Sequence, residues 1–432
     1  MTGEKLIIIK EKQGGVRLKN KNFLWALLGM LMLLVLAACS GGDSKEDGEK
    51  ATTPASASGE SNPNNRTVVI GGLYDITGGT GDVGTPYAEG EKAYFEHLNA
   101  KGGIEGLDLQ LIGKDYAYKI PEAQKIYQEL RDKEKVAAVL GWGTGDTEAL
   151  RQQIATDELP YFSASFSENL KDIKKSPYNF LIAASYSDQG RTVLQWIKEN
   201  HKGENPTVAL LYNDSAFGRS PIEDIKKYGE EIGVKVVDEQ VIDVKATEAQ
   251  SQLLNMKKKK PDYAIINQTW SATATILRDA KTLGIDTQFI GLNWASGEGV
   301  IDIAGKDVVE GYIGVLSHAF PYEDFPGMTE VKEYLDSKGK TIDDINQKFI
   351  QGWTAAKIMV EGVRIAAEKN PEGDITGAQI REGLETFNNF DLGGLAAPLT
   401  YTADNHAGTE QTRLGIVKDG KWEQLTEYRS YK

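Results

Sequence analysis

Two runs of alternating strands and helices constrain the fold of this sequence more than any other feature. Short segments rich in β-branched residues alternate with longer amphipathic segments, first over residues 66–183 and again over 187–315. Strands that alternate with helices are typical of parallel sheets whose faces are covered by helices. The sequence therefore predicts an α/β fold with two lobes, each built around its own parallel sheet.

The individual strands are predicted from short β-branched and aromatic runs bounded by turn-forming residues. The predicted strands of the first run are 67–70, 107–112, 136–140, 161–163 and 180–184. Those of the second run are 207–212, 234–241, 263–267, 288–291 and 311–317. Helices are predicted between them and from 328 to 386, and strand-like segments return at 399–402, 413–417 and 422–426.

The N-terminal segment differs in character from the rest of the chain. Basic residues precede an apolar run over 23–36, and small residues then lead to Cys39. This order is typical of a secretory signal and resembles a bacterial lipobox, in which the cysteine is lipidated and becomes the first mature residue. The apolar run is shorter than the ~20 residues that a transmembrane helix needs. We therefore predict a signal peptide over 1–38 and a lipid anchor on Cys39, facing the periplasm or the cell exterior.

Residues 39–65 are predicted to form a flexible tether between the lipid and the folded body. They are rich in Ser, Gly, Pro, Thr and Glu and contain almost no large apolar side chain. Such a composition cannot bury enough surface to fold on its own.

Composition excludes several classes of protein. Cys39 is the single cysteine among 432 residues, so once it carries lipid no disulfide framework or thiolate metal site remains. The net charge of −14 does not suit binding to nucleic acid. The four histidines are scattered, and the nucleophile-elbow pattern Gly-x-Ser-x-Gly is absent from the sequence. We expect no catalytic residues, no metal, no cofactor and no nucleic-acid partner.

Loops that follow strands are the candidates for a binding site, because open α/β sheets bind ligands beyond the carboxyl ends of their strands. The first such loop, 71–84, contains Gly79-x-Gly81-x-x-Gly84, which matches the dinucleotide fingerprint in letters. Its glycines lie ~8 residues past the strand rather than at a tight turn, and the expected acidic residue is absent. We therefore interpret these glycines as exposing backbone amides to a ligand at a helix N-terminus.

The other loops combine small residues, hydroxyls and aromatic rings. Loop 141–147 offers three glycines, the indole of Trp142 and the hydroxyl of Thr144, and it can also cap the next helix. Loop 163–167 is rich in serine, which allows close approach of a ligand. The matching loops of the second run are 212–218, 268–271 and 292–295.

Several segments occur in a fixed order between about residues 66 and 425. They are Leu98-Asn99-Ala100-Lys101-Gly102-Gly103-Ile104, Asp115 followed by Pro121 and Ala123, Asn213-Asp214-x-x-x-Gly218, Leu277-Arg278-x-Ala280 and Thr287-Gln288-Phe289-Ile290-Gly291. In this order they resemble the periplasmic binding proteins of the leucine/isoleucine/valine-binding type, which serve ABC importers.

The resemblance implies a type I fold in which two lobes are joined by three crossover strands and close on a small-molecule ligand. On this basis we expect lobe 1 to contain residues 66–185 and 318–390, and lobe 2 residues 186–317 and 391–432. It also implies that the protein is a monomer that delivers its ligand to a membrane permease. The expected ligand is a branched-chain amino acid or a related small carboxylate-bearing solute.

The resemblance also assigns candidate site residues. Positions that hold the ligand carboxylate in the family fall on Thr144, Gly145, Ala164 and Phe166, where Phe166 replaces an expected small hydroxyl residue. The position of the acid that receives the ligand ammonium falls on Asn293 or Trp294, so Asp146 or Asp75 would have to substitute, or the ligand carries no ammonium. The candidate ligand-binding residues are Tyr74, Trp142, Thr144, Gly145, Asp146, Ala164, Ser165, Phe166, Phe217, Trp270, Asn293 and Trp294.

Two other classes share a two-lobed architecture. Ligand-sensing receptor domains are followed by a transmembrane helix, and the sequence after residue 257 contains no apolar run of ~20 residues. DNA-binding regulators begin with a basic helix-turn-helix, where this chain has the predicted signal and tether. The lysines at 257–260 are better explained as cations at the negative end of a helix. A binding protein is the preferred interpretation; a binder of an aromatic acid, amide or other non-amino-acid solute, or a receptor domain, is the alternative.

Overall fold

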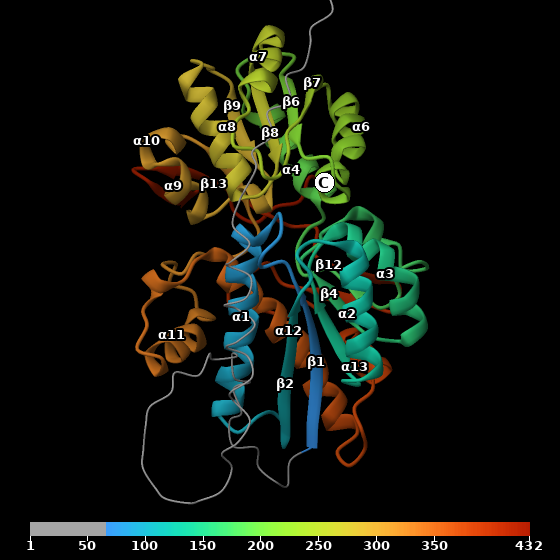
Figure 1. The fold of residues 1–432 in the computed structure, drawn as a ribbon. Coiled ribbons are helices and arrows are strands. Elements are labelled where there is room, and N and C mark those ends of the chain that lie inside the picture. The colour runs from blue at the N-terminus through green and yellow to red at the C-terminus, as the bar shows by residue number, and fades with distance from the viewer. Residues whose placement is uncertain (1–65) are drawn as a thin grey trace, which may run out of the picture. The chain divides into compact units, whose positions relative to one another are not determined.

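The computed structural model describes residues 66–432, so the predicted signal peptide, Cys39 and tether lie outside the described residues. Within 66–432 the strands form two large sheets and a small two-stranded sheet, and Figure 1 shows their arrangement.

The first sheet contains five parallel strands in the order β2-β1-β3-β4-β5. They are β1 (Arg66–Tyr74), β2 (Leu107–Asp115), β3 (Ala138–Gly141), β4 (Tyr161–Ser163) and β5 (Asn179–Phe180). Strands β3 and β4 are buried along their whole length, as expected for parallel strands covered on both faces. This sheet and its helices are called lobe 1.

The second sheet has the order β14-β13-β10-β9-β8-β6-β7. Its strands are β6 (Thr207–Tyr212), β7 (Lys235–Val241), β8 (Tyr263–Asn267), β9 (Gln288–Gly291), β10 (Ile313–Leu316), β13 (Arg413–Lys418) and β14 (Lys421–Gln424). Strands β6 to β10 are parallel and repeat the strand order of the first sheet, whereas β13 and β14 are antiparallel additions. The order therefore reverses at β1/β3 in lobe 1 and at β6/β8 in this second sheet, lobe 2.

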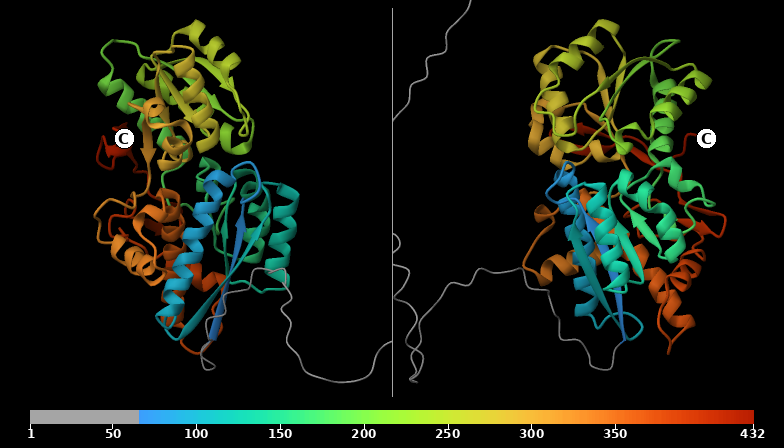
Figure 2. Two further views of the ribbon diagram at one scale, coloured as in Figure 1. Left: turned by 60° about the vertical axis from the view of Figure 1, so that its left-hand side comes forward. Right: turned by 45° about the vertical axis from the view of Figure 1, so that its right-hand side comes forward.

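Helices cover both sheets, and Figures 1 and 2 show α1 and α2 on opposite sides of β1 and β2. The helices of lobe 1 are α1 (Gly81–Ala100), α2 (Ile120–Asp132), α3 (Thr144–Asp157), α11 (Met328–Ser337), α12 (Gln347–Lys369) and α13 (Gly377–Leu384). Those of lobe 2 are α4 (Tyr186–Asn200), α5 (Ala216–Arg219), α6 (Ile222–Ile232), α7 (Gln250–Lys259), α8 (Trp270–Thr282), α9 (Glu298–Ala304) and α10 (Lys306–Val309). The predicted α/β fold with helix-covered parallel sheets is confirmed.

Helices α1 and α12 approach each other through glycine. A Cβ atom on Gly90 would lie 2.0 Å from the carbonyl oxygen of Phe349, and one on Gly352 would lie 1.9 Å from that of Tyr87. Because both contacts are with backbone, the separation of the two helices depends on the missing side chains. This crossing positions α1, whose first turn reaches the candidate site.

Within residues 66–432 the chain passes between the two large sheets three times: from β5 to α4, after β10, and before β13. The small sheet of β11 (Thr400–Thr402) and β12 (Asn405–Gly408) lies beside β5. His318, just after β10, pairs with Ala396, so segments that are distant in sequence lie together where the lobes join. The predicted division of the chain into lobes at residue level stays a prediction.

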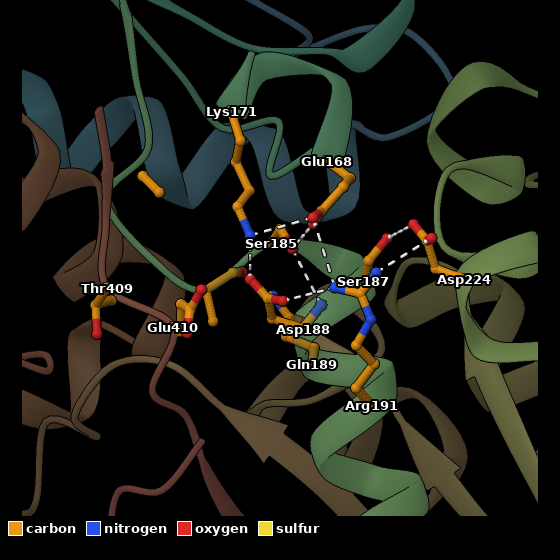
Figure 3. A network of polar contacts seen from close by, with 12 residues as sticks. Glu168, Lys171, Ser185, Ser187, Asp188, Gln189, Arg191, Asp224, Thr409 and Glu410 are labelled. Atoms are coloured by element: carbon orange, nitrogen blue, oxygen red, sulfur yellow. Dashed lines mark hydrogen bonds and ion pairs between the residues drawn. The ribbon is translucent and has the colours of Figure 1, made fainter. Parts of the chain in front are cut away.

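A network of ion pairs surrounds the first passage between the lobes, as Figure 3 shows. The carboxylate of Asp188, in the first turn of α4, lies 2.9 Å from Lys171 Nζ and 2.8 Å from Arg191 Nη1. Lys171 ends a short 3-10 helix of lobe 1, whereas Arg191 also pairs with Asp224 of α6 at 3.1 Å. The start of α4 is therefore held to both lobes beside the chain passage.

Candidate ligand-binding site

A small cavity lies between the lobes at the carboxyl ends of their parallel strands. Its volume is about 20 Å³. The lining residues come from the loops and first helical turns that follow strands of both sheets, and they are Thr80, Val83, Tyr118, Trp142, Gly143, Thr144, Ala164, Tyr186, Phe217, Thr269 and Trp294. The loops after β1, β3, β6 and β8 mark the two reversals of strand order, where open α/β sheets bind ligands. A volume of this size holds about one water molecule, so a larger solute requires side chains or lobes to move apart.

Aromatic side chains of both lobes meet at this cavity. The ring centroid of Trp294, which follows β9 in lobe 2, lies 5.1 Å from that of Trp142 and 6.0 Å from that of Tyr87. Phe166 stacks on the same indole with its ring plane inclined by 13° at 5.9 Å. Three rings of lobe 1 therefore surround one indole of lobe 2, and each such pair contributes ~0.5–1.5 kcal/mol beyond area burial. These contacts stabilise the closed arrangement of the lobes.

Hydrogen bonds fix the orientation of the two indoles. Trp294 Nε1 donates to the hydroxyl of Tyr186 at 3.0 Å, and Trp142 Nε1 donates to Thr80 Oγ1 at 2.8 Å. Thr80 Oγ1 in turn donates to Asp75 at 2.7 Å. Burial raises the pKa of Tyr186 to about 12, so its hydroxyl keeps its proton at neutral pH.

Three of the helices that begin at the cavity, α1, α3 and α8, have their N-cap residue in its wall. These N-cap residues are Thr80, Gly143 and Thr269, and none makes a side-chain capping bond. The amides of a first helical turn carry partial positive charge and favour an anionic group such as a carboxylate. The hydroxyl of Thr269 is buried and has no hydrogen-bond partner among the described residues. The site therefore offers both amides and a free hydroxyl to a ligand oxygen.

No lining side chain of the cavity carries a charge. Asp75 accepts hydrogen bonds from Gly78 N at 2.6 Å, Thr80 N at 2.7 Å and the Thr80 hydroxyl, so its oxygens are engaged within lobe 1. Asp146 accepts from the hydroxyl of Tyr116 at 2.8 Å, and burial raises the pKa of its carboxyl to about 7. The cavity as arranged here supplies no counter-charge for a ligand ammonium.

A buried lysine lies behind Trp294 and was not among the predicted residues. Lys348, the second residue of α12, donates from Nζ to Asn293 O at 2.8 Å and to Gln347 Oε1 at 3.2 Å. Its Nζ also lies 5.1 Å from the ring centroid of Trp294, within cation–π range. Burial lowers the pKa of this amine to about 7, while Glu298 acts in the opposite direction. Because lysines are seldom fully buried, a lysine in a sequence gives no sign of such a role.

The structure brings five of the twelve predicted site residues to the cavity wall: Trp142, Thr144, Ala164, Phe217 and Trp294. Three others contact wall residues from behind. The hydroxyl of Ser165 lies 2.7 Å from that of Thr144, Phe166 stacks on Trp294, and Asn293 directly precedes it.

The remaining four predicted residues do not reach the cavity wall in this arrangement; they are Tyr74, Gly145, Asp146 and Trp270. Tyr74 is buried with its ring against Gly113 of β2. Trp270 turns its ring toward α9, where a Cβ on Gly299 would lie 2.0 Å from it. Contact with a solute stays a prediction for all twelve residues.

Six wall residues were not predicted from the sequence: Thr80, Val83, Tyr118, Gly143, Tyr186 and Thr269. Thr80, Gly143 and Thr269 lie in loops that the sequence marked as candidates, and their N-cap positions were the available signal. Tyr118 follows β2 with a φ of 58°, a backbone conformation that its sequence does not indicate.

Comparison with known proteins decides the family. Residues 67–421 match the family model described as periplasmic binding protein. The chain belongs to this family. Its members are transport components and not enzymes, and membership places this binding protein in the periplasm or outside the cell. Over residues 66–432, no helix has both the length and the apolar character needed to cross a bilayer.

Individual relatives are similar over most of the binding protein. The leucine-, isoleucine-, valine-, threonine- and alanine-binding protein of Pseudomonas aeruginosa is 23% identical over 309 residues, which are 71% of this chain and 80% of the relative. A branched-chain amino acid ABC transporter structure from Thermus thermophilus with bound valine has a TM-score of 0.80 and 28% identity, and the match covers 85% of this chain and 97% of that chain. An ABC transporter substrate-binding protein from Aeropyrum pernix has a TM-score of 0.79 and 29% identity, with 85% and 96% covered. The predicted family is therefore confirmed.

Proposed function

We propose that the protein is the lipid-anchored substrate-binding component of an ABC importer. It captures a branched-chain amino acid or a related small carboxylate-bearing solute between its lobes and delivers it to a membrane permease. The observation that carries this proposal is the interlobe cavity, where three helix N-termini meet aromatic rings from both lobes. Helix amides suit a carboxylate, and the rings suit an apolar body. The valine-bound relative with 28% identity supports this class of solute.

The cycle follows from the position of the cavity between the lobes. The solute first binds the amides and hydroxyls of lobe 1, and the lobes then close about the chain passages as hinged binding proteins do. Closure seats Trp294 among the rings of lobe 1. The closed form docks on the permease, which releases the solute.

A second class of ligand is a solute without an ammonium group, such as an aromatic acid or an amide. The uncharged wall of the cavity favours it. A buried ammonium without a counter-charge is costly, so a zwitterion would bind less well than its des-amino analogue.

Three related ligands test the solute class: valine, 3-methylbutanoate, which lacks the ammonium, and valinamide, which lacks the carboxylate. We expect the two carboxylates to raise the unfolding temperature of the purified protein and valinamide to leave it unchanged. At a concentration of 100 times its dissociation constant, a ligand adds ~2.7 kcal/mol to the free energy of unfolding. If only valine stabilises the protein, the solute is a zwitterion. If only 3-methylbutanoate stabilises it, the solute belongs to the second class. Stabilisation by valinamide, or by a sugar only, contradicts the requirement for a carboxylate.

Replacement of Cys39 tests the anchor. In cells, Cys39→Ala should move the protein from the membrane fraction to the soluble fraction and abolish incorporation of labelled palmitate, because the thiol that would carry the lipid is lost. Ser40→Ala is the matched control and should behave as the unaltered protein. A Cys39→Ala protein that stays in the membrane fraction contradicts the anchor.

A further inference from the structure

The N-terminus of α8 is capped from the opposite lobe. Its own N-cap residue, Thr269, makes no side-chain capping bond. Instead, Ser271 N donates to Asp82 Oδ2 at 2.7 Å, and Asp82 belongs to lobe 1. Ser271 is the second residue of α8, and its amide is one that an N-cap side chain normally binds. A carboxylate of one lobe therefore performs the capping of a helix in the other.

The surroundings of Asp82 favour this contact only when the lobes are close. Asp82 lies in the first turn of α1, and its Oδ1 accepts from Val83 N at 3.0 Å. The adjoining loop lies against lobe 2, since a Cβ on Gly79 would be 3.1 Å from Val244 Cγ1. Lys245 and Arg278 of lobe 2 line the same mouth of the cleft as Asp82, a space of about 430 Å³. Their positive charges attract the carboxylate as the lobes approach.

The capping by Asp82 explains why the hydroxyl of Thr269 is unused. In an ordinary helix start, the hydroxyl of an N-cap threonine accepts from the amide of the second or third helical residue. Here that hydroxyl is buried and has no partner among residues 66–432, and Thr269 belongs to the wall of the ligand cavity.

We propose that Asp82 is a positioning residue that couples lobe closure to ligand binding by freeing the Thr269 hydroxyl for the ligand. In the open protein, Ser271 N lacks Asp82 and is capped by Thr269. When the lobes close, Ser271 N donates to Asp82 instead, and the hydroxyl of Thr269 turns into the cavity. The identity of the ligand rests on the proposed function, whereas the exchange of caps concerns the lobes themselves.

Interlobe distances test the closure step without relying on any ligand. Cys39 is the single cysteine, so the full chain with Cys39→Ala accepts spin labels at Glu122→Cys on lobe 1 and Thr247→Cys on lobe 2, both exposed. We expect Asp82→Ala to lower the fraction of molecules with the short distance, with and without added valine or 3-methylbutanoate. Glu89→Ala, which removes an exposed acid from the same helix, should leave the distribution unchanged. Equal distributions in Asp82→Ala and the unaltered protein overturn the proposal.

Affinity measurements test the coupling through Thr269. Asp82→Ala should weaken the binding of whichever carboxylate binds by about five- to tenfold, which is the effect of one lost cap. Asp82→Asn keeps an acceptor oxygen and should weaken binding by less. In a Ser271→Pro background the amide is absent, and proline is tolerated in a first helical turn, so Asp82→Ala should cost less than in the unaltered protein. In a Thr269→Val background no hydroxyl can cap the amide in place of Asp82, so the cost of Asp82→Ala should be at least as large as in the unaltered protein. An undiminished cost in the Ser271→Pro background, or a smaller cost in the Thr269→Val background, overturns the proposal. If neither carboxylate binds the unaltered protein, the proposed function fails while the distance measurement still decides the exchange of caps.

Discussion

Replacing Trp294 with alanine is expected to lower the affinity for the solute by about 100-fold. Trp294 is the indole of lobe 2 that three rings of lobe 1 surround, and its Nε1 donates to the hydroxyl of Tyr186 in α4. Removing a buried tryptophan costs ~3–5 kcal/mol. Part of this free energy stabilises the closed arrangement of the lobes, and that part is lost from the free energy of binding. Calorimetric titration of the purified protein with valine and 3-methylbutanoate measures this loss.

Trp422 provides the matched control for this experiment. It is similarly buried in lobe 2, but it packs against Tyr312 and Phe320 instead of the cavity. Trp422→Ala should lower the unfolding temperature and leave the affinity of the folded protein unchanged. Trp294→Phe, which keeps a ring but loses the N–H, should bind more tightly than Trp294→Ala. The assignment of Trp294 to closure fails if Trp294→Ala binds as tightly as the unaltered protein.

Gly352→Ala is expected to lower the free energy of unfolding by about 3 kcal/mol, although alanine is the better helix former. The added Cβ would lie 1.9 Å from the carbonyl oxygen of Tyr87, so α1 and α12 must separate. Because α1 carries Asp82 and the N-terminal turn at the cavity, binding should weaken as well. Denaturant unfolding measures the change in stability.

Gly362 of the same helix is the control for the backbone contact. A Cβ there would meet the side chains of Leu384 and Ile380, at 2.7 Å and 3.2 Å, and not a carbonyl group. Side chains can change rotamer more easily than a helix can shift, so Gly362→Ala should cost less. Equal losses at the two positions contradict the importance of the α1–α12 spacing.

The fold was predictable because its signals are local. The alternation of β-branched runs with amphipathic helices reports the burial of each element, and burial on both faces of a strand implies a parallel sheet. The carboxyl ends of such strands identify the loops of the site, so the segments that contain Thr144, Ala164 and Trp294 could be selected from sequence.

The side chains within those loops were less predictable, because their direction depends on contacts with distant residues. Trp270 and Trp294 both follow strands of lobe 2. The ring of Trp270 packs on Gly299, whereas the ring of Trp294 contacts Trp142 of lobe 1. No local pattern distinguishes the two indoles. Lys348 carries no sequence signal either, since its partner Asn293 lies 55 residues away.

The sequence by itself therefore determined the α/β class, the two parallel sheets and the loops from which a binding site is built, because these follow from the periodicity and burial of single segments. Only the tertiary structure decided which side chains face one another across the cleft. The bond between Asp82 and Ser271 joins residues 189 positions apart, and it forms only because two lobes, each folded around its own sheet, place a carboxylate and a helix N-terminus together.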